Sequence, residues 1–331
     1  MDFFTILSQL EEVDPEVYGR LDSRRAVFKH LGGLGQKLTA AALPLAVGAV
    51  FNKAYAQTPV GASVADVLNF ALKLEYLEMY FYQQRTSVAA TAYNQLSATN
   101  RAALDLIATD EANHVRFLRS TIAALGATAI PDPTALTFDF SAGKGSATGP
   151  LADYRTNPAT YLALAQSFED LGVRAYKGAA PLVATNRAVL TAALSIHAVE
   201  ARHSSHLRAM RRAYGTNATP AQGIPVAPYS AAPKSWVSGT DGGGPIPAGG
   251  AGISTLPIYS GGNNNNAPSN ITFPAEDNVT QGGISLSTST SPNFSGFPAS
   301  AFSEAFDEGL DVGTVSTIAR LFVITNSTLF S

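Results

Sequence analysis

Two short motifs in this sequence pair a carboxylate with an imidazole one helical turn apart. Glu111-Ala-Asn-His114 and Glu200-Ala-Arg-His203 share the pattern Glu-x-x-His. Residues three apart leave the same face of an α-helix, so a carboxylate oxygen and an imidazole nitrogen can reach one metal ion. One such motif arises easily by chance on a solvated helix. Two of them indicate a metal site.

Two isolated glutamates complete the pattern on other segments. Glu75 lies in KLEYLEMYFY and Glu169 in SFEDLGVRAY, and each precedes a tyrosine, Tyr82 or Tyr176, by seven residues. Seven residues are almost two helical turns, so each Glu–Tyr pair shares a face. The order Glu, Glu-x-x-His, Glu, Glu-x-x-His is typical of dinuclear carboxylate sites in helical bundles. We therefore predict six metal ligands: Glu75, Glu111, His114, Glu169, Glu200 and His203.

The charges of such a site indicate its chemistry. Two divalent ions about 3.5–4 Å apart carry four positive charges, which four glutamates neutralise, two of them by bridging. Oxygen donors with two imidazoles suit iron or manganese and leave open positions for oxygen species. We therefore expect two Fe ions, or alternatively two Mn ions, and a reaction with oxygen or peroxide. Tyr82 and Tyr176 are candidate catalytic residues, through donation of an electron or a hydrogen bond.

Other polar residues lie beside the predicted ligands. Three of them are competing carboxylates: Glu78, Asp110 and Asp170. Glu78 is the main rival of Glu75 because it follows one turn later, but only Glu75 repeats the seven-residue spacing to a tyrosine. His197 and His206 are expected to face solvent or to form local hydrogen bonds. The arginines of 208–212 are interpreted as a charged helix end that favours the helix dipole.

Four predicted helices carry these residues, one motif on each. Ser63-x-x-Asp66 reads as a capping box at the start of the first, and Asn157-Pro158 as the start of the third. Gly126 is expected to follow the end of the second. The predicted helices span about 63–84, 97–125, 157–180 and 185–214.

One connection between these helices is much longer than the others. Residues 126–156, about 31 in number, separate the second helix from the third and are rich in Pro, Gly, Ser and Thr. A crossover of this length lets the third helix run parallel to the second. One long crossover in a four-helix bundle is the ferritin-like topology, so we predict an all-α fold of this kind.

Residues 63–214 resemble the bacterial ferritin-like domain family that is related to desiccation-associated and rubrerythrin-like proteins. The stretches LNFALKLEYLEMYFY, DEANHVRFLR, SFEDLGVRAY and HAVEARHSSHLR carry this likeness. FPAEDNVTQGG and AFDEGLDVGTVSTIARLF look like the C-terminal extension of that family. The resemblance implies a di-iron carboxylate site with the six ligands named above, and a role in stress. The sequence has no cysteine, so a rubredoxin-type iron centre is excluded.

The composition divides the chain into three predicted parts: a leader (1–56), a ferritin-like four-helix bundle (57–214) and a C-terminal extension (215–331). The extension holds 16 of the 28 glycines and 11 of the 19 prolines, so we expect it to be mostly irregular. Strand-like pieces such as GISLSTS and a helix at about 303–322 are expected within it. Trp236 and several phenylalanines are expected to anchor it on the bundle.

The leader resembles an export signal. SRRAVFK, at 23–29, is similar to the bacterial twin-arginine motif, and an apolar run follows at 38–51. Ala54-Tyr55-Ala56 then fits the small-x-small rule for cleavage. We therefore expect an exported protein, in the periplasm or at the cell surface.

The bulk numbers exclude other classes of partner. A net charge of −3 gives no electrostatic footprint for nucleic acid. No apolar run reaches the length of a transmembrane span. A homo-oligomer is compatible with the sequence.

One functional interpretation stands out from these patterns, with two alternatives. The main prediction is an exported dinuclear metal protein, either a di-iron oxidase or ferroxidase or a peroxide-detoxifying stress protein. The alternatives are a dinuclear manganese catalase, and a structural or surface-protective protein that assembles through its C-terminal extension. Storage inside a hollow shell is disfavoured, because an extension of about 117 residues needs space that compact cages seldom leave.

Overall fold

A computed structural model describes residues 63–217, 256–263, 272–286, 297 and 299–331 of the chain. The predicted leader and Trp236 lie outside these residues. Within the described part, no helix is both long enough and apolar enough to cross a lipid bilayer.

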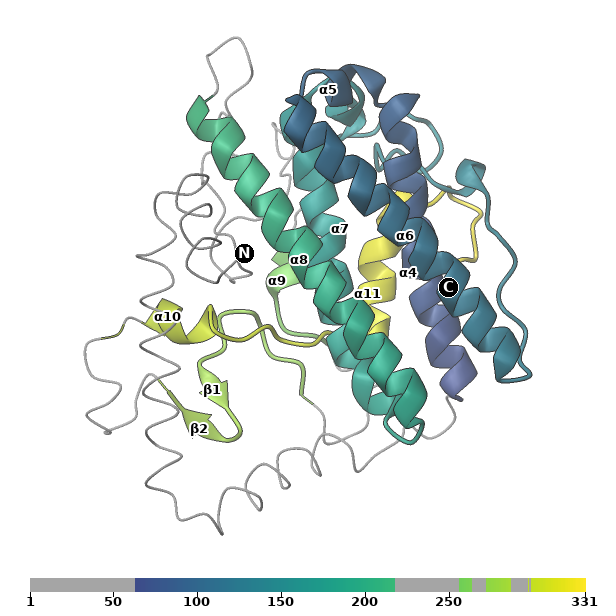
Figure 1. Ribbon diagram of the computed structural model, residues 1–331, viewed down its shortest axis with the longest axis vertical. Helices are drawn as coiled ribbons and strands as arrows, with labels where there is room; N and C mark the ends of the chain where they lie inside the picture. The colour runs from purple at the N-terminus through teal and green to yellow at the C-terminus, as the bar shows by residue number, and fades with distance from the viewer. Residues whose placement is uncertain (1–62, 218–255, 264–271, 287–296, 298) are drawn as a thin grey trace, which may run out of the picture. The chain divides into compact units, whose positions relative to one another are not determined.

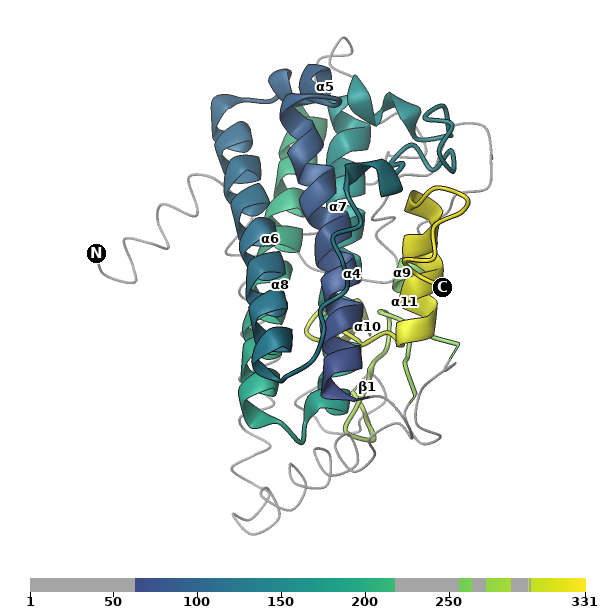
Figure 2. The ribbon, with the colours of Figure 1, turned by 90° about the vertical axis from the view of Figure 1, so that its right-hand side faces the viewer.

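Four long helices lie side by side and form a bundle (Figures 1 and 2). α4 packs mainly against α6, and α7 packs mainly against α8. The connection from α6 to α7 is the long one, which confirms the predicted all-α bundle with one crossover. The helices are α4 (Val64–Gln83), α6 (Ala98–Ala124), α7 (Pro158–Ala179) and α8 (Arg187–Asn217).

Short elements join these helices. Between α4 and α6 lie the 3-10 turn η1 (Gln84–Thr86) and α5 (Ala90–Asn94). The crossover contains two 3-10 turns, η2 (Ala135–Thr137) and η3 (Ala152–Arg155). A fourth 3-10 turn, η4 (Ala180–Val183), links α7 to α8.

The starts of the helices follow the local sequence. Ser63 accepts a hydrogen bond from the backbone N–H of Asp66, whose carboxylate accepts from the N–H of Ser63, so the predicted capping box is present. Asn157 caps α7 in the predicted way, by accepting from the N–H of Ala159. After α6, Gly126 adopts φ = +74°, a conformation that glycine reaches without strain.

Two predicted helix boundaries are wrong. α8 continues past Gly215 to Asn217, because a single glycine weakens a helix by only about 1 kcal/mol and does not end it. The single helix predicted at 303–322 is instead two: α10 (Ala299–Ser303) and α11 (Val312–Ala319), the latter followed by the 3-10 turn η6 (Arg320–Phe322). Asp311 sets the start of α11, since its side chain accepts from the N–H of Thr314.

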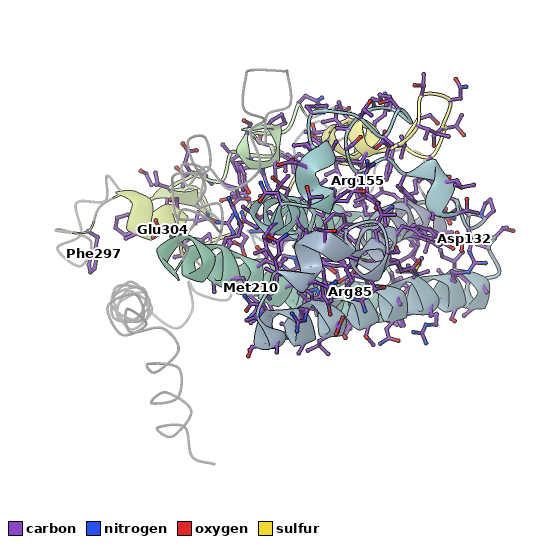
Figure 3. The ribbon with its side chains drawn as sticks, turned by 90° about the horizontal axis from the view of Figure 1, so that it is seen from above. Arg85, Asp132, Arg155, Met210, Phe297 and Glu304 are labelled. Atoms are coloured by element: carbon purple, nitrogen blue, oxygen red, sulfur yellow. The ribbon has the colours of Figure 1, made fainter. Side chains whose placement is uncertain are left out.

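Aromatic side chains fill the space between α4, α7 and the crossover. The Phe81 ring stacks on Tyr161 with a centroid distance of 4.9 Å and meets Phe168 and Phe140 edge-on at 5.1 and 5.2 Å. All four are buried, and each such side chain contributes about 1.5–3 kcal/mol by leaving water. Figure 3 shows the side chains that fill the spaces between the helices.

Three C-terminal segments pack on α7: 256–263, which contains α9 (Leu256–Tyr259), 272–276 and 307–331. Arg174 organises them. Its guanidinium is fully buried, lies 2.7 Å from Glu276 Oε1 and donates to backbone carbonyls that include those of Ser260 and Pro274. The predicted anchoring by phenylalanine also occurs here, since Phe273 and Phe322 are buried.

Residues 277–306 belong to a second, smaller compact unit of the chain. A two-residue antiparallel ladder joins β1 (Thr280–Gln281) to β2 (Ile284–Ser285). β2 lies in the predicted strand-like stretch GISLSTS, and β1 precedes it. Leu286 and Phe302 form the core of this unit, with the ring of Phe297 6.2 Å from that of Phe302.

Candidate metal centre

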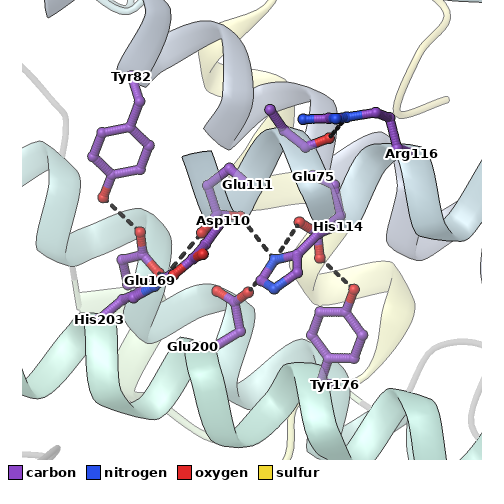
Figure 4. A network of polar contacts seen from close by, with 11 residues as sticks. Glu75, Tyr82, Asp110, Glu111, His114, Arg116, Glu169, Tyr176, Glu200 and His203 are labelled. Carbon is purple, nitrogen blue, oxygen red and sulfur yellow. Dashed lines mark hydrogen bonds and ion pairs between the residues drawn. The ribbon is translucent and has the colours of Figure 1, made fainter. Parts of the chain in front are cut away.

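The six predicted ligands converge inside the bundle (Figure 4). α4 supplies Glu75, α7 supplies Glu169, and α6 and α8 each supply one Glu-x-x-His motif. The four glutamates are completely buried, and the two histidines are 6 and 8% exposed. The helical spacing therefore turns all six side chains inward, although four of them are carboxylates.

The six residues form two overlapping groups of four. In each group, one ligand atom from every member lies within 4.8 Å of the others. Glu111 and Glu200 belong to both groups, so the two groups share these two carboxylates. The first group is completed by Glu75 and His114, and the second by Glu169 and His203.

Both imidazoles point into the carboxylates. His114 Nδ1 lies 3.2 Å from Glu75 Oε2, 3.2 Å from Glu111 Oε2 and 3.3 Å from Glu200 Oε1. His203 Nδ1 lies 2.9 Å from Glu111 Oε1 and 3.2 Å from the carboxylate of Glu169. Each Nδ1 therefore faces the space where a cation would be bound.

Three side chains hold these groups from outside. Tyr82 OH donates to Glu169 Oε1 at 2.5 Å, and Tyr176 OH donates to Glu75 Oε1. The predicted tyrosines therefore touch ligands, each on the helix opposite its own. Asp110 Oδ2 lies 3.2 Å from His203 Nε2, so it fixes the orientation of that ring and leaves Nδ1 facing the carboxylates.

Burial and mutual repulsion shift the acids of the cluster. Burial and the nearby charge of Glu169 raise the pKa of Glu111, hydrogen bonds with His114 and His203 lower it, and the resulting pKa is about 7. The pKa of Glu200 is held well above its usual value by burial and by the charge of Glu111. For His203, burial lowers the pKa, but the charge of Glu169 and hydrogen bonds to the carboxylates raise it to about 12. Without a cation, the cluster therefore has to retain protons.

The donor atoms of the cluster fit a metal ion. Glu200 Oε2 is buried and accepts no hydrogen bond from the described residues, and Glu111 Oε1 and Glu200 Oε1 meet only histidine nitrogens, outside hydrogen-bond geometry. A buried carboxylate oxygen without a donor is costly unless a cation compensates for it. The buried Glu/His cluster is therefore a candidate metal-binding site.

Two of the competing carboxylates, Asp170 and Glu78, belong to neither four-residue group. Asp170 is fully buried, but Arg208 Nη2 binds it at 2.5 Å and Tyr259 OH donates to it at 2.5 Å. Arg208 is buried as well, and α8 continues nine residues beyond it, so the interpretation of the arginines as a charged helix end is wrong for Arg208. Glu78 is 3% exposed and lies near the cluster, but outside both groups of four. Burial, and next the charge of Glu200, raise its pKa well above the usual value.

The flanking histidines differ from each other. His206 is exposed, as predicted. His197 is half-buried near Asp307 and Lys177, and burial lowers its pKa. The sequence around His197 could not predict that Asp307 lies near it, because Asp307 is more than a hundred residues away in the sequence.

Comparison with known proteins agrees with this geometry. Neither the curated proteins nor the solved structures gave a match to the chain. A family model described as "Ferritin-like domain" matches residues 63–213, which contain α4, α6, α7, most of α8 and all six residues of the cluster. The chain therefore contains a ferritin-like domain, and a buried carboxylate–histidine cluster lies at its centre.

Proposed function

We propose that this domain binds two transition-metal ions, and that the ions are iron. The observation that carries the proposal is the pair of four-residue groups that share Glu111 and Glu200. Dinuclear sites hold their ions about 3.5–4 Å apart, and shared carboxylates are the usual bridges. Carboxylate oxygens with one imidazole per ion suit Fe(II), and they suit Mn(II) as well.

Charge balance supports a pair of divalent ions. Four buried glutamates carry four negative charges when ionised, which equals the positive charge of two such ions. The same count requires neutral histidines, and neutral imidazole is the form that binds metals. The ions would therefore replace the protons that the cluster otherwise retains.

We further propose that the site oxidises Fe(II) with oxygen or reduces peroxide. A bound iron pair supplies the redox chemistry of these reactions. The chain contributes a water-poor interior and fixed ligand positions. Tyr82 and Tyr176 keep Glu169 and Glu75 in place and provide phenolic hydrogens next to the ligands. Burial and the adjacent glutamates raise the pKa of both phenols, so they stay protonated as donors.

Export to the periplasm or the cell surface is proposed from the twin-arginine-like pattern at 23–29 and the small-x-small site that ends at Ala56. A stress-related role is proposed from the resemblance to desiccation-associated proteins. Both proposals rest on the sequence. A fusion of residues 1–62 to a reporter tests the first, because export should be lost when Arg24 and Arg25 are both replaced by Lys.

Elemental analysis of protein purified without added metal tests the main proposal. We expect two iron atoms per chain, and Fe(II)-dependent oxygen uptake that disappears in Glu111→Ala. Rapid oxygen release from peroxide by a manganese-containing protein would favour a catalase instead. Absence of metal, together with normal folding of Glu200→Ala/His203→Ala, would refute the proposal and favour a structural role.

A further inference from the structure

The metal centre has an internal two-fold relation. The helices α4 and α6 correspond to α7 and α8, and each residue of the centre in the first pair of helices has a counterpart of the same type in the second. These counterparts are Glu75 and Glu169, Tyr82 and Tyr176, Glu111 and Glu200, and His114 and His203.

The contacts repeat in the same way. Each tyrosine donates to the glutamate on the opposite helix. Each imidazole also meets the shared glutamate of the other motif, at 3.3 Å for His114 with Glu200 and at 2.9 Å for His203 with Glu111. The two halves of the centre therefore have matching geometry.

This relation extends beyond the ligands. Arg119 on α6 donates to Tyr76 OH on α4 at 2.6 Å. At the corresponding positions, Arg208 on α8 binds Asp170 on α7. Tyr76 and Asp170 each follow a ligand glutamate directly, and Arg119 and Arg208 each follow one by eight residues. This constant spacing identifies the counterpart of each residue in the other half.

Glu78 breaks the two-fold relation, because its counterpart on α7 is Gly172. Each tyrosine of the centre faces the glutamate of the opposite helix, so α4 and α7 run antiparallel. Glu78 and Gly172 are then level with each other, midway between the two Glu–Tyr contacts. The two-fold axis that relates the two halves of the centre passes through this level.

The space at Gly172 holds the Glu78 carboxylate. A Cβ atom added to Gly172 would lie 3.1 Å from Glu78 Oε1 and 2.8 Å from Glu200 Oε2. Because even one carbon would be tight, a second glutamate would not fit there. The centre therefore has room for a single extra carboxylate on its axis, beside the shared ligand Glu200.

No other group explains why this acid is buried. Glu78 is 3% exposed, and among the described residues its carboxylate makes no hydrogen bond or ion pair. Its neighbours are the four glutamates of the cluster. A carboxylate in such a place requires a compensating cation or a proton.

We propose that Glu78 is a seventh ligand of the metal pair, placed on the axis so that it can reach either ion or bridge them. The inference rests on the proposed metal binding and adds a residue to it. Glu78 lies outside both four-residue groups, so binding requires rotation about its side-chain bonds. The absence of a side chain at Gly172 leaves space for that rotation.

Titration of the full-length, metal-free protein with Mn(II) alone tests this role, by calorimetry without oxygen. We expect the wild type to bind two ions and Glu78→Gln to bind at least one of them more than tenfold more weakly. Gly172→Ala should weaken binding in the same direction, since its methyl group crowds both Glu78 and Glu200. Asp132→Asn removes an equal charge from an exposed hydrogen bond with Tyr80 and should leave both affinities unchanged.

The outcomes separate the two proposals. If the wild type binds two ions and Glu78→Gln binds them equally well, Glu78 is not a ligand, while the dinuclear site stands. If the wild type binds none, both proposals fail. Should Glu78→Gln not fold, a crystal structure of the Mn(II)-loaded wild type decides. A Glu78 oxygen about 2.2 Å from an ion supports the inference, and one beyond about 3 Å overturns it.

Discussion

Arg174 offers the sharpest test of how the C-terminal segments are held on the bundle. Its guanidinium is fully buried on α7 and pairs with Glu276, which is also fully buried. It donates as well to the carbonyls of Ile258, Ser260, Pro274, Glu308 and Gly309. We predict that Arg174→Met, which keeps the length of the side chain, loosens these segments.

The expected loss of stability follows from the charge that the substitution leaves without a partner. Removing one partner of a buried ion pair costs about 3–5 kcal/mol, because the other charge stays buried without compensation. Here that charge is the carboxylate of Glu276. Replacing both partners by apolar residues avoids this penalty, so Arg174→Met/Glu276→Met should be more stable than Arg174→Met alone by about 1 kcal/mol or more.

Urea unfolding followed by far-UV circular dichroism measures the loss of stability. Limited proteolysis with mass spectrometry shows whether residues 256–276 and 307–331 are released first. Glu276→Met alone completes the double-mutant cycle. The reasoning is refuted if Arg174→Met lies within about 1 kcal/mol of the wild type, or if the two substitutions are additive.

Three further predictions concern other parts of the molecule. Because burial raises the pKa of Glu111 to about 7, Mn(II) affinity should fall as the pH drops below that value, with proton release seen in weakly buffered titrations. Burial raises the pKa of Asp139, but hydrogen bonds from Ser141 and from backbone N–H groups outweigh burial and keep the pKa below 3.8. These hydrogen bonds stabilise the folded state above about pH 4, and this stabilisation is lost as the pH falls further. Asp139→Asn should therefore cost about 1.5–3 kcal/mol in urea unfolding near pH 7, and this cost should shrink as the pH falls below about 4. Gly178→Ala should cost about 1–3 kcal/mol by thermal unfolding, because its new methyl group would overlap the backbone of Leu310; an unchanged melting temperature would contradict that packing.

The bundle was predictable because its signals are local. Ser63 and Asn157 mark helix starts within a few residues, and the spacing of each Glu-x-x-His motif places both side chains on one face. The order of the motifs along four helices then indicates that the faces meet. No such local signal exists for the pair of Arg174 and Glu276, which are about a hundred residues apart in sequence.

The predictions made from the sequence were least accurate for buried charged residues. Arg208 and Arg211 look like part of a charged helix end in sequence, because arginine is rarely buried without a partner. Their partners, Asp170 and Gln166, lie on another helix, and only the packing of α7 on α8 brings them together. Glu78 shows the same limit, since the glycine that gives it space is 94 positions further along the chain.

Every residue of α7 except Lys177 is buried. The helices α4 and α8, the crossover turn η3 and the segments with α9 and α11 all pack against it. A second copy of the chain therefore has no access to α7, whichever way it approaches. Apolar side chains that remain open to a neighbour lie elsewhere, on α6 at Leu106 and Phe117 and on α8 at Leu194. Within the described residues, self-association through the bundle would therefore use α4, α6 or α8, and not the helix that carries Glu169.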